Sequence, residues 1–126
     1  MPFTVEFDES GFIHAVYEGD LTMAGLQALM SAAADVIQEH ECFLILSDYR
    51  QARMAATIAD IYELPKLILQ RAKERGMSAH RVKRALIIPA AAYEQFRFFE
   101  TVSLNNAQTV RLFTDEDEAR EWLLAS

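Results

Sequence analysis

The sequence is poor in cysteine, glycine and proline, with one, four and three of them in 126 residues. A single cysteine, Cys42, excludes an internal disulfide framework and is typical of a reducing compartment. No stretch rich in serine, glycine or proline offers a linker, so we predict one domain spanning residues 1–126. Because 52% of the residues are hydrophobic, that domain can bury one sizeable core.

Long hydrophobic runs are also missing. The longest apolar run, from Ala85 to Ala92, has eight residues and contains Pro89, which is far too short for a transmembrane segment. Residues 1–3 lead directly into a strand pattern, without the basic and apolar regions of a secretory signal. We therefore expect a cytoplasmic protein.

Signatures of catalysis and metal binding are absent from the sequence. No nucleophile elbow, phosphate-binding loop or dinucleotide-binding glycine motif occurs. His14, His40 and His80 fall in three separate segments without the spacing of a metal site, and Cys42 enters an apolar run where a small core residue is expected. We expect no catalytic residue, no metal and no cofactor, and therefore not an enzyme.

The net charge of −7 is unevenly distributed. Residues 1–49 contain nine acidic side chains and no Lys or Arg, whereas residues 50–111 contain eleven basic and five acidic ones. The overall acidity argues against nucleic acid as a partner. The basic side chains in the middle of the chain could dock on an acidic protein or on anionic lipid headgroups, or could simply neutralise the acidic C-terminal segment. They are Lys66, Arg71, Lys73, Arg75, Arg81, Lys83 and Arg84.

Hydrophobic periodicity is the strongest signal that the sequence does contain. Alternating or continuous apolar residues predict strands over 3–7, 12–18, 42–46, 82–88 and 107–113. Spacing of three and four predicts helices over about 23–39, 58–75, 89–105 and 115–124. Ser47 and Asp48 should end the third strand before a polar loop over 49–55, and Pro65 should either kink its helix or start a second one.

The order of these elements, β-β-α-β-α-β-α-β-α, indicates an α/β fold. An N-terminal β-hairpin should be followed by repeated β-α units. Strands joined by helices are parallel, so we expect a mainly parallel five-stranded sheet with about four helices covering both faces.

Several short motifs carry a family resemblance that covers nearly the whole chain. They are Gly19-Asp20-Leu21-Thr22, Leu46-Ser47-Asp48, Phe96-Arg97-Phe98-Phe99-Glu100, and Val110 to Asp115 followed by Ala119, Trp122 and Leu123. With the length and element order, they resemble the SpoIIAA-like branch of the STAS superfamily of anti-sigma-factor antagonists. These are small bacterial proteins related in shape to lipid-binding CRAL-TRIO domains. The resemblance implies a single STAS-like domain.

The resemblance also implies a switch position before the second helix. In the superfamily, a phosphorylatable serine lies there in an Asp-Ser-Ser-Gly-like loop. The comparable stretch here, residues 53–59, has neither the acidic neighbour nor the glycine, and Thr57 falls near the position of that serine. Thr57 is therefore a candidate phosphoacceptor, or simply the N-cap of its helix.

Two further candidate sites follow from the residues themselves. Ligands of parallel sheets bind beyond the carboxyl ends of the strands, where Asp48, Arg50 and Arg53 could hold a phosphate or carboxylate, or could be ordinary loop side chains. The aromatic residues of the 89–105 helix could line an apolar pocket, form a dimer contact, or belong to the core with an exposed flank. They are Tyr93, Phe96, Phe98 and Phe99.

The sequence thus favours a non-enzymatic cytoplasmic regulatory or protein-interaction module of STAS-like type. The alternative is a carrier of a small apolar or amphiphilic, lipid-like ligand between the aromatic helix and the sheet. The partner would be another protein, and a homodimer is a further expectation.

Overall fold

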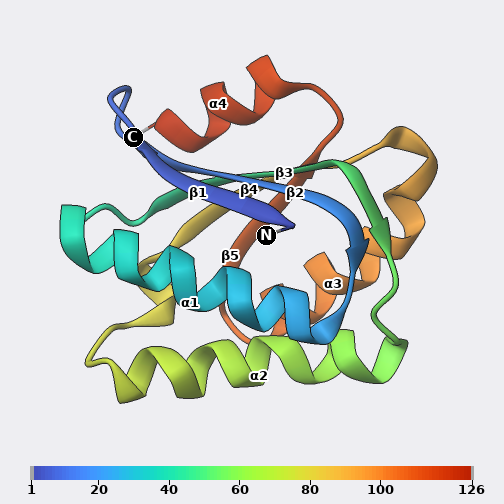
Figure 1. Cartoon of the computed structure of the whole chain (residues 1–126), viewed down its shortest axis with the longest axis horizontal. Coiled ribbons are helices and arrows are strands. Elements are labelled where there is room, and N and C mark those ends of the chain that lie inside the picture. Colours follow the sequence, from blue (N-terminus) through green and yellow to red (C-terminus); the bar gives the residue numbers. More distant parts are fainter. Residues whose placement is uncertain (1, 126) are drawn as a thin grey trace.

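One sheet carries the whole architecture of the computed structural model, which describes residues 2–125 (Figure 1). Its strands are β1 (Phe3–Asp8), β2 (Phe12–Leu21), β3 (Leu44–Met54), β4 (Lys83–Ile87) and β5 (Thr109–Phe113). The helices are α1 (Met23–His40), α2 (Ile58–Glu74), α3 (Tyr93–Asn105) and α4 (Glu116–Leu124). Spatial order follows sequence order, with β1 antiparallel to β2 and all other neighbours parallel. The predicted α/β architecture is confirmed.

The helices form unequal layers on the two faces of the sheet. Figure 1 shows α4 alone on one face and α1, α2 and α3 on the other. Helices α1 and α3 pack on strands, whereas α2 packs chiefly against α1 and α3 and lies farthest from the sheet (Figure 1). The three-helix face is therefore deeper than a single helical layer, and α2 forms its roof.

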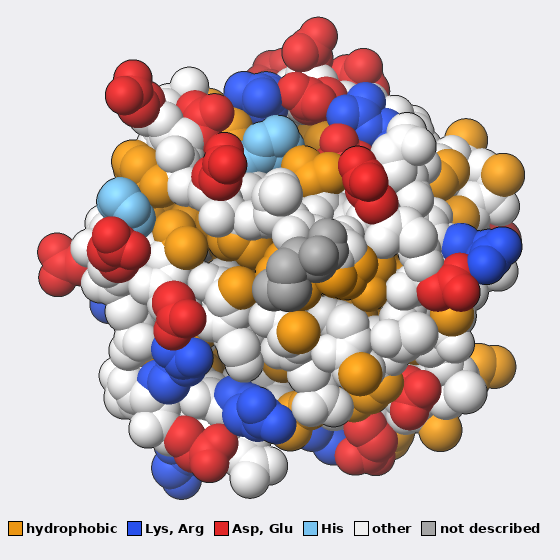
Figure 2. All heavy atoms as spheres, viewed as in Figure 1, with side chains coloured by type: hydrophobic (Ala, Val, Ile, Leu, Met, Phe, Trp, Pro, Cys, Tyr) orange, Lys and Arg blue, Asp and Glu red, His pale blue; other side chains and the backbone are white. Residues whose placement is uncertain are grey.

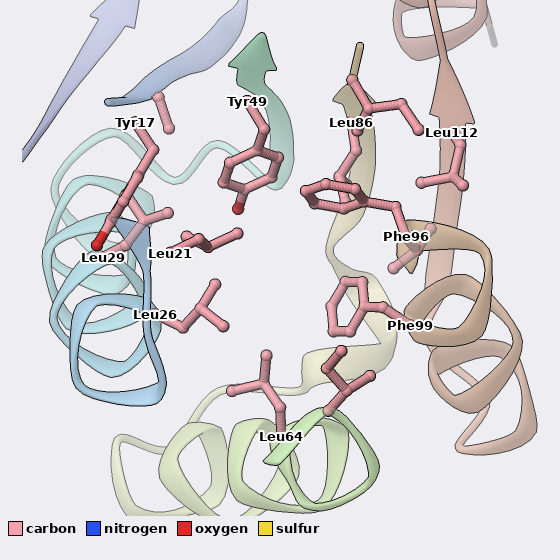
Figure 3. Close-up of a cluster of buried hydrophobic side chains, with 14 of the residues drawn as sticks. Tyr17, Leu21, Leu26, Leu29, Tyr49, Leu64, Leu86, Phe96, Phe99 and Leu112 are labelled. Carbon is pink, nitrogen blue, oxygen red and sulfur yellow. The ribbon is translucent and has the colours of Figure 1, made fainter. Parts of the chain in front are cut away.

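Three apolar clusters hold these layers together. On the three-helix face, the largest includes Tyr17, Leu26, Leu64 and Phe96 (Figure 3). A second cluster on that face, beneath α1, consists of Ile13, Ala33, Ile37 and Ile45. The cluster beneath α4 is smaller and consists of Phe12, Leu46, Ala85, Ile87, Phe113, Ala119 and Leu123. Burying a Leu, Ile or Phe side chain contributes about 1.5–3 kcal/mol, so these side chains together stabilise the packing of the short α4 on the sheet.

Side-chain caps explain where α1 and α4 begin. The Thr22 hydroxyl accepts a hydrogen bond from the backbone N–H of Gly25 at 3.0 Å, which caps α1. The Asp115 carboxylate does the same for the N–H of Glu118 at 2.9 Å at the start of α4. Both caps satisfy backbone donors that the helix itself leaves unpaired.

The structure differs from the sequence-based prediction at β3 and at Pro65. Strand β3 does not end at Ser47 and Asp48 but continues to Met54, so most of the predicted polar loop is strand. Its second half pairs with the end of β2, after a register shift opposite Tyr17. Helix α2 passes through the buried Pro65 as one element, so no second helix starts there.

Charged side chains of both signs are interspersed on the face that Figure 2 shows, with acidic ones gathered over α4. Three acidic residues, Glu116 to Glu118, occupy the first turn of α4, where their negative charges interact favourably with the positive end of the helix dipole. Within residues 2–125, every helix is too short or too polar to cross a bilayer.

Candidate functional site

A cavity of about 300 Å³ lies between α1, α2 and the sheet. The apolar face of α1 forms one wall with Leu26, Leu29 and Ile37, and the sheet forms the floor with Ile45 of β3. Phe99 of α3 contributes to the wall as well. A concave, mostly apolar site of this volume is at the lower end of the range that small-molecule pockets occupy.

The space arises because small side chains face one another beneath α2. Helix α1 presents Ser31, Ala33 and Ala34 to the cavity, α2 presents Ala72, and β2 presents Ala15. Since α2 rests on α1 and α3 rather than on the sheet, these short side chains do not reach across the layer. The small side chains therefore leave a cavity in the layer between α2 and the sheet, which larger side chains would fill.

Polar groups enter the cavity from the sheet side. Successive side chains of a strand point to opposite faces, so Ser47 and Tyr49 of β3 share the face of α1 and α2. Figure 3 shows the Tyr49 ring reaching from β3 into the space between Leu21 and Phe96. Burial raises the pKa of Tyr49, so its phenol is neutral at physiological pH and can donate a hydrogen bond.

Arg84 of β4 is the charged group on the floor of the cavity. Its Nη2 donates to Gln108 Oε1 at 3.1 Å, and Gln108 Nε2 donates in turn to the Pro65 carbonyl at 2.7 Å. The guanidinium carbon lies 5.5 Å from the centroid of the Phe99 ring. Burial lowers the pKa of Arg84, but a guanidinium stays protonated in proteins.

No acidic side chain compensates this charge in the described part of the chain, where every salt bridge involves another cation. Glu74 lines the outer part of the cavity but is exposed and forms no ion pair with Arg84. Desolvating a cation without a counter-ion is costly. The floor of the cavity is therefore mostly apolar with one positively charged position, whereas the charged side chains of Arg71, Glu74 and Arg75 lie toward its rim.

Exposed polar contacts join α1 to α2 at the rim of the cavity. Arg75 Nη1 lies 2.8 Å from Asp35 Oδ1 and 3.1 Å from Gln38 Oε1. Arg71 Nη2 lies 3.4 Å from Gln27 Oε1. Exposed pairs of this kind are worth little each, so they can open without a large loss of stability.

The predicted anion-binding residues lie elsewhere and already have partners. Asp48 and Arg50 point to the α4 face, where Arg50 Nη2 lies 2.7 Å from Asp48 Oδ2 and 2.8 Å from Glu116 Oε1. Arg53 pairs with Asp20 instead. Burial alone would raise the pKa of Asp48, but hydrogen bonds from Arg50 outweigh it and hold that pKa below its usual range. The structure does not bring these three residues together into one site.

The predicted aromatic residues divide between core and surface. Phe96 and Phe99 are buried, and Phe99 lines the cavity, whereas Tyr93 and Phe98 are exposed. The cavity lies mainly beneath α1 and α2 rather than between α3 and the sheet, where the sequence analysis had expected it. A dimer contact through the exposed pair stays a prediction, which light scattering in solution can test.

Thr57 forms the N-cap of α2. Its hydroxyl accepts from the N–H of Asp60 at 3.1 Å, and Asp60 Oδ2 accepts from the Thr57 N–H at 3.1 Å. This reciprocal pair is a capping box. Thr57 is also exposed, so its role as a phosphoacceptor stays a prediction.

Sequence reasoning grouped Arg84 with surface cations and so missed it as a site residue. The neighbouring Lys83 points to the opposite face, where its Nζ donates to the Trp122 carbonyl at 2.6 Å. Strand alternation alone separates Lys83 from Arg84, and that signal could have assigned Arg84 to the interior. What no pattern revealed is the hollow into which it points.

Comparisons with known proteins bear on the fold. No model of a known protein family matches the chain, and no curated protein matches it significantly. Among solved structures, it is similar to an uncharacterised DUF3478-family protein with a SpoIIAA-like fold from Shewanella loihica PV-4. The TM-score is 0.60 at 15% identity, covering 96% of this chain and 91% of that one. The chain therefore has the SpoIIAA-like fold.

Proposed function

We propose that this protein is a non-enzymatic binding module of STAS-like type that holds a small apolar or amphiphilic ligand in the cavity beneath α1 and α2. The observation that carries the proposal is the combination of about 300 Å³ of mostly apolar space with a few polar groups on its floor. Pockets for small molecules have this composition, because apolar walls supply affinity and sparse polar groups fix orientation.

The surroundings of the cavity support binding rather than catalysis. Its ionisable floor groups, Tyr49 and Arg84, are a neutral phenol and a permanent cation, neither of which is poised to exchange protons near neutral pH. The rim contacts between α1 and α2 are exposed and weak, so a ligand can enter between these helices.

Filling the cavity tests the proposal. The fluorescent amphiphile anilinonaphthalene sulfonate should bind the wild-type protein saturably, and Ala33→Phe should abolish that signal because Ala33 lines the cavity. Ala28→Phe is the matched control, since Ala28 is exposed on the same helix. Equal fluorescence from all three proteins, or none from the wild type, would contradict the proposal.

A second function, docking on another protein, is favoured by the start of α2. Ile58 and Tyr62 are 73% and 51% exposed and lie in the first turns of α2, which Thr57 caps. Apolar side chains exposed at helical spacing suit a protein contact, and a phosphate on Thr57 would change the charge beside it. We propose this surface as the regulatory contact.

Affinity capture with variants tests the docking surface. Ile58→Asp, Tyr62→Asp and the phosphomimic Thr57→Asp should each change the set of captured proteins. Leu104→Asp is the control, because Leu104 is 53% exposed on α3, outside this surface. If the Leu104 variant behaves like the other three, the docking surface is not at α2.

A further inference from the structure

We propose that the cavity beneath α1 and α2 takes a single-chain carboxylic acid, with its carboxylate on Arg84 and its alkyl chain against the apolar face of α1. The inference rests on the proposed function, because it names the ligand class of the same cavity.

The charge of Arg84 lacks an acidic partner. Arg84 is half-buried and lines the cavity, and in the described part of the chain its one hydrogen bond goes to a neutral amide, Gln108. Its remaining N–H groups have no acidic partner there, and Gln108 is itself held in place by the Pro65 carbonyl. A guanidinium presents its donors as a planar fork that matches a carboxylate, so an anion at this point offsets the desolvation of the cation.

The number of charges selects a carboxylate over a phosphate. Arg84 is the cation on the floor of the cavity, and Ser47 and Tyr49 add only neutral hydroxyl groups. One carboxylate makes the pair neutral, whereas a phosphate monoester carries about two negative charges at neutral pH and would leave one uncompensated. The rim adds no net charge to this balance. Arg75 is paired with Asp35, and the exposed Arg71 and Glu74, which both line the outer part of the cavity, carry opposite charges.

The shape of the cavity selects a single chain. Leu29, Ala33 and Ile37 repeat along one face of α1, opposite Ile45 on the floor, and together they form a continuous apolar wall. A volume of about 300 Å³ equals roughly ten water molecules at liquid density. That space accommodates one short or medium alkyl chain but not the two chains of a membrane lipid.

Calorimetric titration of the full chain with decanoate and with its uncharged counterpart 1-decanol tests the head-group assignment. The two probes share the alkyl chain and differ at the head, so their affinity ratio measures the contribution of the charge. We expect decanoate to bind at least about tenfold more tightly than decanol, as a charge-assisted hydrogen bond implies. Decyl phosphate should bind more weakly than decanoate.

Two arginine variants test whether the preference for decanoate over decanol arises in the cavity. Arg84→Met keeps the approximate size of the side chain without its charge, and should bind decanoate at least about tenfold more weakly while leaving decanol unchanged. Arg81→Met is the matched control, because Arg81 is a nearby exposed arginine that stacks on Phe43. Urea unfolding verifies that each variant folds. Arg84→Met should lose some stability but keep the fold, since it removes a half-buried charge and also leaves the amide oxygen of the buried Gln108 without its donor.

The outcomes separate the two proposals. Equal binding of decanoate and decanol to the wild type overturns the carboxylate assignment and leaves an apolar ligand in place. An unchanged preference in Arg84→Met overturns the role of Arg84. Absence of binding by either probe overturns the proposed function itself. Should Arg84→Met fail to fold, the comparison of the two probes on the wild-type protein still decides the head group.

Discussion

At Gly25, the first turn of α1 lies directly against the ring of Tyr17. A Cβ at this position would overlap Tyr17 Oη and would lie 3.0 Å from Tyr17 Cζ. The ring cannot retreat, because Tyr17 is buried and its hydroxyl donates to the Asp20 carbonyl at 3.0 Å. Glycine is therefore required here by close approach.

Gly25→Ala should destabilise the protein. Helix propensity alone would favour alanine by about 1 kcal/mol, but the overlap should cost about 1–3 kcal/mol more than that gain. Urea denaturation measures the difference. In a Tyr17→Phe background, which removes the nearest atom, the cost of Gly25→Ala should shrink, and a double-mutant cycle reports this coupling. A more stable Gly25→Ala protein would contradict the packing described for α1.

Asp48 makes a pH-dependent contribution to stability. Its folded-state pKa lies below the unfolded value of 3.8, because hydrogen bonds from Arg50 outweigh the effect of burial. A lowered carboxylate pKa stabilises the folded state above the unfolded pKa, and that contribution is lost as pH falls through the folded pKa. Arg50 is partly exposed, so solvent screening limits the contribution to about 1 kcal/mol.

Asp48→Asn should accordingly lower the free energy of unfolding by about 1 kcal/mol at pH 7 and by progressively less below about pH 4. Chemical denaturation at a series of pH values measures the trend. Asp35→Asn serves as the control, because Asp35 is in an exposed pair with Arg75, and it should change stability little at any pH. A constant difference between wild type and Asp48→Asn down to pH 3 would be inconsistent with this account.

Among the elements, α2 has a reciprocal cap at its start. The Thr57–Asp60 capping box satisfies two backbone donors at its start, and Ile61 and Leu64 bury only one side of the helix. Thr57→Ala should lower the free energy of unfolding by about 1 kcal/mol, whereas Thr57→Ser, which keeps the hydroxyl, should be close to neutral. Thermal unfolding compares the three proteins. Equal loss in both variants would show that the cap contributes nothing.

Most elements could be predicted from the sequence because the spacing of their apolar residues is regular. The C-terminal end of β3 could not be predicted in this way. The register shift opposite Tyr17 adds one residue to β3, so the inward positions become Tyr49, Ala52 and Met54. That spacing breaks the strict alternation of inward and outward side chains, so the sequence pattern predicts a polar loop instead of a strand. A β-bulge therefore interrupts the alternation of apolar and polar residues by which a strand is predicted from sequence.

At the scale of the whole molecule, the unequal layers decide what the sequence can reveal. The α4 face is thin and filled, so its residues follow from strand alternation alone. The opposite face depends on how far α2 stands from the sheet, which is set by its contacts with α1 and α3. No single segment encodes that distance, and for this reason the cavity and the position of Arg84 on its floor emerge only from the assembled fold.

We propose above that the cavity beneath α1 and α2 is the ligand site. Amide chemical-shift mapping of the isotope-labelled protein during titration with decanoate tests it most directly. Saturable shifts should concentrate at lining residues such as Leu29, Ala33, Ser47 and Arg84, with α4 unaffected. Shifts confined to the Ile58 surface of α2, or none that saturate, would contradict the account.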